Sequence, residues 1–105
     1  MPANYSYKIK SFQSILQNSY PYLKNKYNIK NMEVFGSYVR GEDNDQSDLD
    51  ILIEFSDETG LGLLEFIRLE NELGELFQLK VDLVMKDSLK ERLKSNILKE
   101  AISLL

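Results

Sequence analysis

The spacing of apolar residues along the chain predicts where its long helices lie. Apolar side chains recur every three or four residues over 9–27, which is the spacing of an amphipathic helix, and Pro21 is expected to kink or restart that helix. The same spacing predicts a last helix over residues 89–105. Ser88 and Glu91 resemble a capping box at the start of this last helix.

A different pattern, in which apolar and polar residues alternate or short apolar runs stop abruptly, predicts the strands. Residues 32–35 form a short apolar run that ends at Gly36, where we expect a strand to turn into a short helix. Residues 49–55 alternate, with the acids gathered at the beginning of the strand. Residues 80–84 give the third strand.

Between these elements the chain supplies loops and one more helix. Residues 42–47 and 56–60 are polar and are predicted to be loops, and residues 63–77 return to helical spacing. Strands and helices therefore alternate from a first helix to a last one. We predict an α/β (α+β) fold, with a small mixed sheet of about three strands flanked by helices, in a single domain over residues 1–105.

Composition excludes several classes of active site. The 105 residues include no Cys and no His, so disulfides, thiol nucleophiles, Ser-His-Asp triads and zinc sites built from Cys or His are absent. Any metal must have oxygen ligands, which favours Mg²⁺, Mn²⁺ or Ca²⁺. With 13 Lys+Arg against 17 Asp+Glu the net charge is −4, which argues against a general nucleic-acid binder.

The chain also lacks the signals of export and membrane insertion. Its first residues have no apolar segment typical of a secretory signal, and its purely apolar runs are only a few residues long. Apolar residues make up 43% of the chain and charged residues 29%, the composition of an ordinary globular domain. We therefore expect a cytoplasmic protein.

Acidic residues are concentrated in one stretch, where no Lys or Arg lies among them. We expect most of them to be solvated loop residues, but Asp48 and Asp50 stand two residues apart at the start of an apolar strand. At ~4 Å and an effective dielectric constant near 20, two such carboxylates repel by about 4 kcal/mol. A raised pKa, a cation or exposure at the strand end must offset this repulsion. The eight acids are Glu42, Asp43, Asp45, Asp48, Asp50, Glu54, Asp57 and Glu58.

A third acid and a glycine turn complete the candidate chemistry. Asp82 lies in the apolar run of the third strand, where it either faces the same pocket as Asp48 and Asp50 or pairs with a nearby lysine. Three carboxylates of this kind can hold two divalent cations for displacement at phosphorus. Gly36-Ser37 after the first strand either forms an anion site or is an ordinary turn with Ser37 as the N-cap.

These features occur in a fixed order along the chain. The sequence reads Gly36-Ser37-x-x-Arg40-Gly41, then Ser47-Asp48-x-Asp50 after five residues, with Asp82 on the next strand. This arrangement resembles the nucleotidyltransferases of the DNA polymerase beta superfamily, and their smallest members, the minimal nucleotidyltransferase (MNT) domains, most closely. The resemblance extends over residues 35–84, and the flanking helices also fit the family's layout, so it implies a polymerase beta palm-like core.

The resemblance also implies roles for the residues that match. Gly36 and Ser37 would contact the β- and γ-phosphates of ATP, and Arg40 would either sit beside the phosphates or tie the short helix to the acidic loop. Asp48, Asp50 and Asp82 would hold Mg²⁺, with two ions expected. Asp82 would also orient or deprotonate the acceptor hydroxyl.

MNT domains of this kind resemble the antitoxins of HEPN/MNT toxin–antitoxin systems. That resemblance implies transfer of AMP from ATP to a tyrosine of a partner HEPN toxin, with no direct nucleic-acid binding and no membrane contact. A chain of 105 residues leaves no room for a separate acceptor-binding domain, which suits a protein acceptor.

Three other interpretations remain at the level of sequence. The first is an antitoxin of the same fold that neutralises its toxin by binding alone. The second is a Ca²⁺ loop over residues 43–54, although Asp48 stands where such a loop needs glycine. The third is the same chemistry with another acceptor, an aminoglycoside or a tRNA end, which usually needs an extra domain.

Overall fold

The described part of the chain folds into a four-stranded sheet with helices packed beside it. The computed structural model describes residues 3–56 and 62–105. The elements in chain order are α1 (Ala3–Tyr27), β1 (Ile29–Phe35), α2 (Ser37–Arg40), β2 (Leu49–Phe55), α3 (Leu63–Phe77), β3 (Val81–Met85), the 3₁₀ turn η1 (Lys86–Ser88), α4 (Glu91–Glu100) and β4 (Ile102–Ser103). The predicted fold class is confirmed, with a fourth, short strand added.

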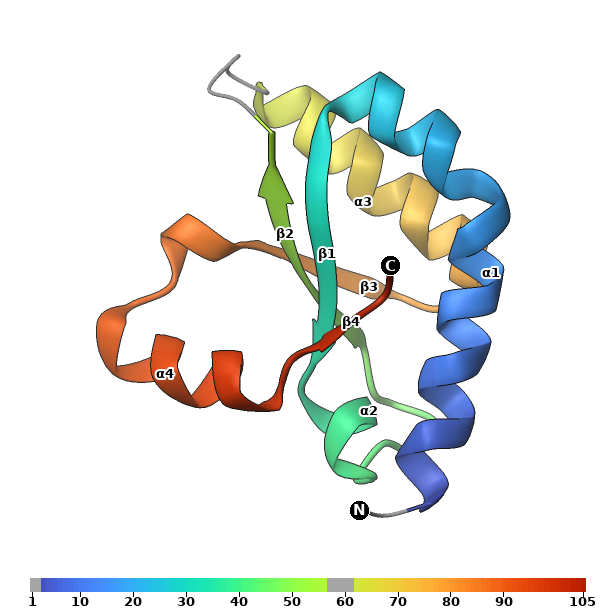
Figure 1. Cartoon of the computed structure of the whole chain (residues 1–105), viewed down its shortest axis with the longest axis vertical. Helices are drawn as coiled ribbons and strands as arrows, with labels where there is room; N and C mark the ends of the chain where they lie inside the picture. The colour runs from blue at the N-terminus through green and yellow to red at the C-terminus, as the bar shows by residue number, and fades with distance from the viewer. Residues whose placement is uncertain (1–2, 57–61) are drawn as a thin grey trace.

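The sheet is mixed, as predicted, and its strands run in the order β3-β2-β1-β4. β1 pairs antiparallel with β2 and with β4, whereas β2 and β3 are parallel. Parallel neighbours need a crossover connection, and α3 supplies it. In Figure 1, α1 and α3 lie together on one side of the sheet and α4 stands on the other side.

The core fills the space between the sheet and the helices α1 and α3. Leu49, Ile51 and Ile53 of β2 point into this core, and Leu16 of α1 and Leu69 of α3 are fully buried against it. Because side chains alternate along a strand, Asp50 and Glu54 fall on the opposite face. The second face therefore carries Asp50 and Glu54 together with Leu52, which is only 1% exposed but lies outside the main core.

The prediction of a helix over residues 89–105 is wrong for the last five residues. α4 ends at Glu100, and residues 101–105 extend along β1 instead, where Ile102 pairs with Val34 and the Leu104 N–H donates to Met32 O at 2.9 Å. Leu104 is only 2% exposed. Pairing with the open edge of β1 satisfies backbone groups and buries Leu104, which outweighs the local helical spacing.

The structure also tests the predicted effect of Pro21, the predicted capping box and the predicted loop over residues 56–60. α1 continues through Pro21 without a restart and bends in its second half (Figure 1). The capping box is wrong, because Ser88 belongs to η1 and the N-cap residue of α4 is Lys90, with no side-chain cap. Of the predicted loop over residues 56–60, residues 57–60 lie outside the described part of the chain. Within that part, no helix is long and apolar enough to cross a membrane.

Candidate active site

The turn between β1 and α2 is built on a glycine that no other residue can replace without strain. Gly36 is buried and has φ +85° and ψ −150°, a backbone conformation essentially confined to glycine. Its carbonyl accepts hydrogen bonds from the Val39 and Arg40 N–H groups at 3.1 and 3.2 Å, which begins the short helix α2. A Cβ atom at Gly36 would lie 2.2 Å from Asp50 Oδ2. The turn and the carboxylate of Asp50 are therefore packed directly together.

Two of the three predicted acids are neighbours across the parallel strands. Asp50 of β2 is in register with Asp82 of β3, and adjacent strands lie about 4.8 Å apart. Asp82 is exposed and Asp50 is partly buried. Burial, then the negative charges of Asp82 and Asp48, raise the pKa of Asp50 to about 6. The pair thus has a deficit of positive charge that a cation would relieve.

Asp48 stands slightly apart from this pair. Its carboxylate lies 4.0 Å from Lys80 Nζ, with the lysine side chain 82% exposed, so this ion pair is weak. Within residues 3–56 and 62–105, no three acidic side chains lie close enough together to bind one metal ion without rearrangement. The structure therefore brings Asp50 and Asp82 together and leaves Asp48 beside them, close enough to affect the pKa of Asp50.

The alternative in which Asp82 pairs with a nearby lysine is wrong. Lys80 pairs with Asp48, and Lys86 pairs with Glu54 at 3.7 Å. Among the described residues Asp82 has no ion-pair partner. An exposed carboxylate next to a partly buried one is chemically suited to contact a ligand or an incoming hydroxyl group.

The predicted nucleotide-binding residues lie on α2 beside these acids. Gly36 is the N-cap and Ser37 the first helical residue, so the alternative with Ser37 as the N-cap is wrong. The Ser37 side chain is partly exposed at the start of this helix. Arg40 donates from Nε to Glu42 at 2.9 Å and from NH1 to Glu100 Oε1 at 3.0 Å. Arg40 thus ties α2 to the acidic loop, which was one of its two predicted roles.

Glu100 is a residue of the site that the sequence reasoning missed. Its Oε2 accepts a hydrogen bond from the Gly36 N–H at 2.7 Å, in addition to the bonds from Arg40. The helical spacing predicts that residue 100 lies within a helix over residues 89–105. No motif or spacing connected it with Gly36, which lies 64 positions earlier.

The acidic loop is attached to the fold more firmly than expected. The sequence predicts a solvated Asp43, but this residue pairs with Lys8 and its side chain is only 9% exposed. Lys8 Nζ also lies 5.6 Å from the centre of the Tyr38 ring. The Ca²⁺-loop interpretation is wrong, because the second half of residues 43–54 is strand β2. Asp57 and Glu58 lie outside the described residues.

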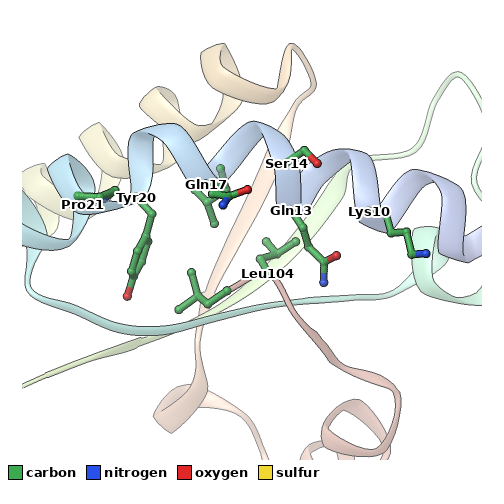
Figure 2. Close-up of a pocket in the computed structure, with 9 residues that line it drawn as sticks. Lys10, Gln13, Ser14, Gln17, Tyr20, Pro21 and Leu104 are labelled. Atoms are coloured by element: carbon green, nitrogen blue, oxygen red, sulfur yellow. The ribbon is translucent and has the colours of Figure 1, made fainter.

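A cavity of about 780 Å³ lies elsewhere in the molecule, between α1 and the end of the chain. Figure 2 shows that Gln13 and Tyr20 extend from α1 toward the end of the chain, where Leu104 lies. The Gln13 side chain donates to Ser103 O at 2.8 Å. The residues that line this cavity include no acidic side chain, so the three predicted acids lie outside it.

Comparison with known proteins identifies the family to which this chain is similar. The family described as "Nucleotidyltransferase domain" matches residues 18–104. The protein adenylyltransferase MntA of Thermococcus cleftensis is 42% identical over 94 residues, which cover 90% of this chain and 93% of the relative. A solved structure described as a "putative minimal nucleotidyltransferase" is 33% identical, covers 94% of both chains and has a TM-score of 0.69.

A more distant structure shares the fold. It comes from a complex of a tri-AMPylated Shewanella oneidensis HEPN toxin with an MNT antitoxin, with 22% identity and a TM-score of 0.61. The match covers 89% of this chain and 71% of the other. At this level of identity the similarity shows the fold alone.

Proposed function

This chain belongs to the nucleotidyltransferase domain family, and we propose that it transfers AMP from ATP to a tyrosine hydroxyl of a HEPN-domain partner. In this role it is the antitoxin of a toxin–antitoxin pair. The observation that carries the proposal is the register of Asp50 with Asp82, with Gly36 packed against Asp50. The acids and the phosphate-binding turn of a nucleotidyltransferase are thereby on one face of the sheet.

The donor set suits a divalent cation, which the family implies. Asp48, Asp50 and Asp82 offer only carboxylate oxygens, the ligands that Mg²⁺ prefers. Burial, then the charges of Asp82 and Asp48, raise the pKa of Asp50 although the charge of Arg40 lowers it, so a cation beside Asp50 would stabilise its ionised form. These three residues would hold Mg²⁺, with two ions proposed, and the cation would supply charge neutralisation at the phosphates.

The chain's own residues account for binding and orientation. Gly36 and Ser37 bind the β- and γ-phosphates, with the Ser37 hydroxyl as a donor. Asp82 is exposed and accepts the proton of the acceptor hydroxyl. The hydroxyl oxygen bonds to the α-phosphorus, the bond from that phosphorus to the bridging oxygen of the β-phosphate breaks, and pyrophosphate leaves. Positioning and charge stabilisation provide most of the rate enhancement.

Two findings support a protein as the acceptor. The relative that is 42% identical over nearly its whole length is named a protein adenylyltransferase. A protein of the same fold has been solved with an AMPylated HEPN toxin. In this chain Asp82 is exposed at the surface, where a tyrosine carried by a second protein can approach it. We also propose that residues 1–105 act as a single catalytic domain.

The test combines the purified protein with labelled ATP, Mg²⁺ and the HEPN protein encoded beside it. Mass spectrometry should detect AMP on a tyrosine of the partner, and the partner's ribonuclease activity should fall in parallel. The Asp48→Asn/Asp50→Asn double variant should leave the partner unmodified. A partner that is inhibited without being modified would instead favour neutralisation by binding alone.

A further inference from the structure

The carboxylate of Glu100 joins the end of α4 to the β1–α2 turn, which lies 64 positions earlier in the chain. It accepts from the Gly36 N–H at 2.7 Å and from Arg40 NH1 at 3.0 and 3.1 Å. Arg40 also reaches Glu42 through Nε at 2.9 Å. A single side chain at the end of α4 therefore contacts the β1–α2 turn directly and the acidic loop through one arginine.

The position of Glu100 is electrostatically unfavourable without these contacts. It is the last residue of α4, where the helix dipole disfavours negative charge. Its side chain is only 23% exposed, so water solvates it incompletely. The hydrogen bonds from Gly36 and Arg40 are charge-assisted and offset both effects. Glu100 is thus engaged with the turn rather than simply exposed at a helix end.

The turn needs support from outside itself. Gly36 has φ +85° and ψ −150°, and such strained conformations persist only where the surroundings over-determine them. α2 has four residues, too few for a stable helix by itself. The Gly36 N–H faces Glu100 while the Gly36 Cα faces Asp50, with no room for a side chain between them. Glu100 therefore contacts the turn through the Gly36 N–H, while Asp50 packs against the Gly36 Cα.

Glu100 is itself held in place by the sheet. No residue of α4 is buried, so packing does not fix the end of this helix. Two residues after Glu100, Ile102 pairs with Val34 of β1, and Ser103 pairs with Glu33. β4 therefore anchors Glu100 to the same strand that leads into Gly36.

We propose that Glu100 is a positioning residue that holds the Gly36–Ser37 turn in its nucleotide-binding conformation, with Arg40 as its partner rather than as a phosphate ligand. This inference rests on the proposed function. It assigns Arg40 to the role of tying α2 to its surroundings and adds a residue from the C-terminal segment to the site.

The test compares Glu100→Ala and Glu100→Gln with Glu91→Ala. Glu91 begins the same helix, is exposed and makes no ion pair within the described residues, so it is a matched control. Two quantities are measured: amide hydrogen exchange at Gly36 by NMR, and KM and kcat for Mg²⁺–ATP in transfer to the HEPN partner. Exchange at Gly36 reports on the turn whether or not the protein has transferase activity.

We expect Glu100→Ala to speed Gly36 exchange and to raise the KM for ATP, each about tenfold, with a smaller change in kcat. Glu100→Gln keeps an acceptor for the Gly36 N–H but loses the charge that binds Arg40, so its exchange and KM should lie between wild type and Glu100→Ala. Glu91→Ala should match wild type. If Glu100→Ala does not fold, Glu100→Gln tests the proposal: a raised KM for ATP supports it, and an unchanged KM contradicts it.

Unchanged Gly36 exchange in Glu100→Ala would overturn the proposal, and so would a KM that stays constant or falls. A lower KM would mean that the carboxylate competes with the phosphates for the turn. A wild-type protein that neither binds ATP nor modifies its partner would overturn the proposed function instead, and Gly36 exchange would still decide the role of Glu100.

Discussion

A Cβ atom on Gly36 would lie 2.2 Å from Asp50 Oδ2, so the turn after β1 and the acid in the middle of the site exclude any side chain between them. Gly36 precedes α2, and Asp50 lies on β2, opposite Phe35 in the β1–β2 register. The close contact fixes the distance between the predicted phosphate-binding turn and a predicted metal-binding carboxylate. Replacement of either residue should therefore affect both groups.

Gly36→Ala should destabilise the fold and abolish transfer. The positive φ costs about 1–3 kcal/mol for a residue with a Cβ, and the contact with Asp50 adds to that cost and displaces the carboxylate. Chemical denaturation and the AMP-transfer assay measure the two effects.

Gly41→Ala is the matched control for Gly36→Ala. Gly41 also has a positive φ, +73°, but a Cβ there would meet nothing within 4 Å. It should lose about 1 kcal/mol of stability and keep its transfer activity. Equal activity losses in the two variants would contradict the assignment of Gly36 to the site.

Replacement of the acids should lower activity without unfolding the protein. Asp50→Asn and Asp82→Asn each remove a charge from the paired carboxylates, and each should lower kcat/KM for transfer by about 100-fold or more. Asp87→Asn, an exposed acid in η1, should be neutral. Full activity in Asp82→Asn would remove Asp82 from the proposed mechanism.

Asp50 should also make the stability of the protein depend on pH. Its pKa rises from 3.8 to about 6 in the fold because of burial and the neighbouring Asp82 and Asp48. Protonation of Asp50 therefore favours the folded state. Its contribution to the free energy of unfolding is complete below pH 3.8 and is lost as the pH rises through about 6.

Without metal, Asp50→Asn should consequently be more stable than wild type at pH 7.5. A shift of this size corresponds to about 3 kcal/mol, which solvent screening at a partly exposed site reduces to about 1–2 kcal/mol. The difference should disappear near pH 4. Urea denaturation in EDTA at both pH values measures it, with Asp45→Asn in the exposed loop as the control. A variant less stable than wild type at pH 7.5 would contradict the charge repulsion.

Divalent cations should stabilise the wild-type protein through the same acids. Mg²⁺–ATP at 100 times its Kd raises the free energy of unfolding by about 2.7 kcal/mol, and the thermal midpoint should rise accordingly. The Asp48→Asn/Asp50→Asn variant should lose this increase, and EDTA should abolish both the increase and AMP transfer. Transfer that continues in EDTA would contradict a metal-dependent reaction.

Phe12 of α1 packs against α2 and α3, so we expect its replacement to lower the free energy of unfolding. Its ring is 7% exposed and contacts the edges of Tyr38 in α2 and Phe77 in α3, with centroids 5.4 and 5.5 Å away. Phe12→Ala should lose about 3–4 kcal/mol of stability. Tyr7→Ala removes a 77% exposed ring from the same helix and should cost less than about 0.5 kcal/mol in the same denaturation experiment.

Local patterns in the sequence determined the elements and the chemical types of the site. The alternation of Leu49, Asp50 and Ile51 predicted both the strand and the separation of core from acid, because side chains alternate along any strand. The apolar run over residues 32–35 stops at Gly36, and this stop predicts the turn after the first strand. The resemblance to the nucleotidyltransferase family, carried by residues 35–84, is confirmed. The roles of the individual site residues stay predictions until the variants are made.

Only the tertiary structure decided which distant groups meet. The parallel register placed Asp82 beside Asp50, and the return of the chain along β1 brought Glu100 to Gly36, 64 positions away. Periodicity reports which face of an element is apolar, but it does not report which strand edge lies open for pairing. Residues 101–105 had helical spacing, yet the unpaired edge of β1 and the burial of Leu104 drew them into the sheet.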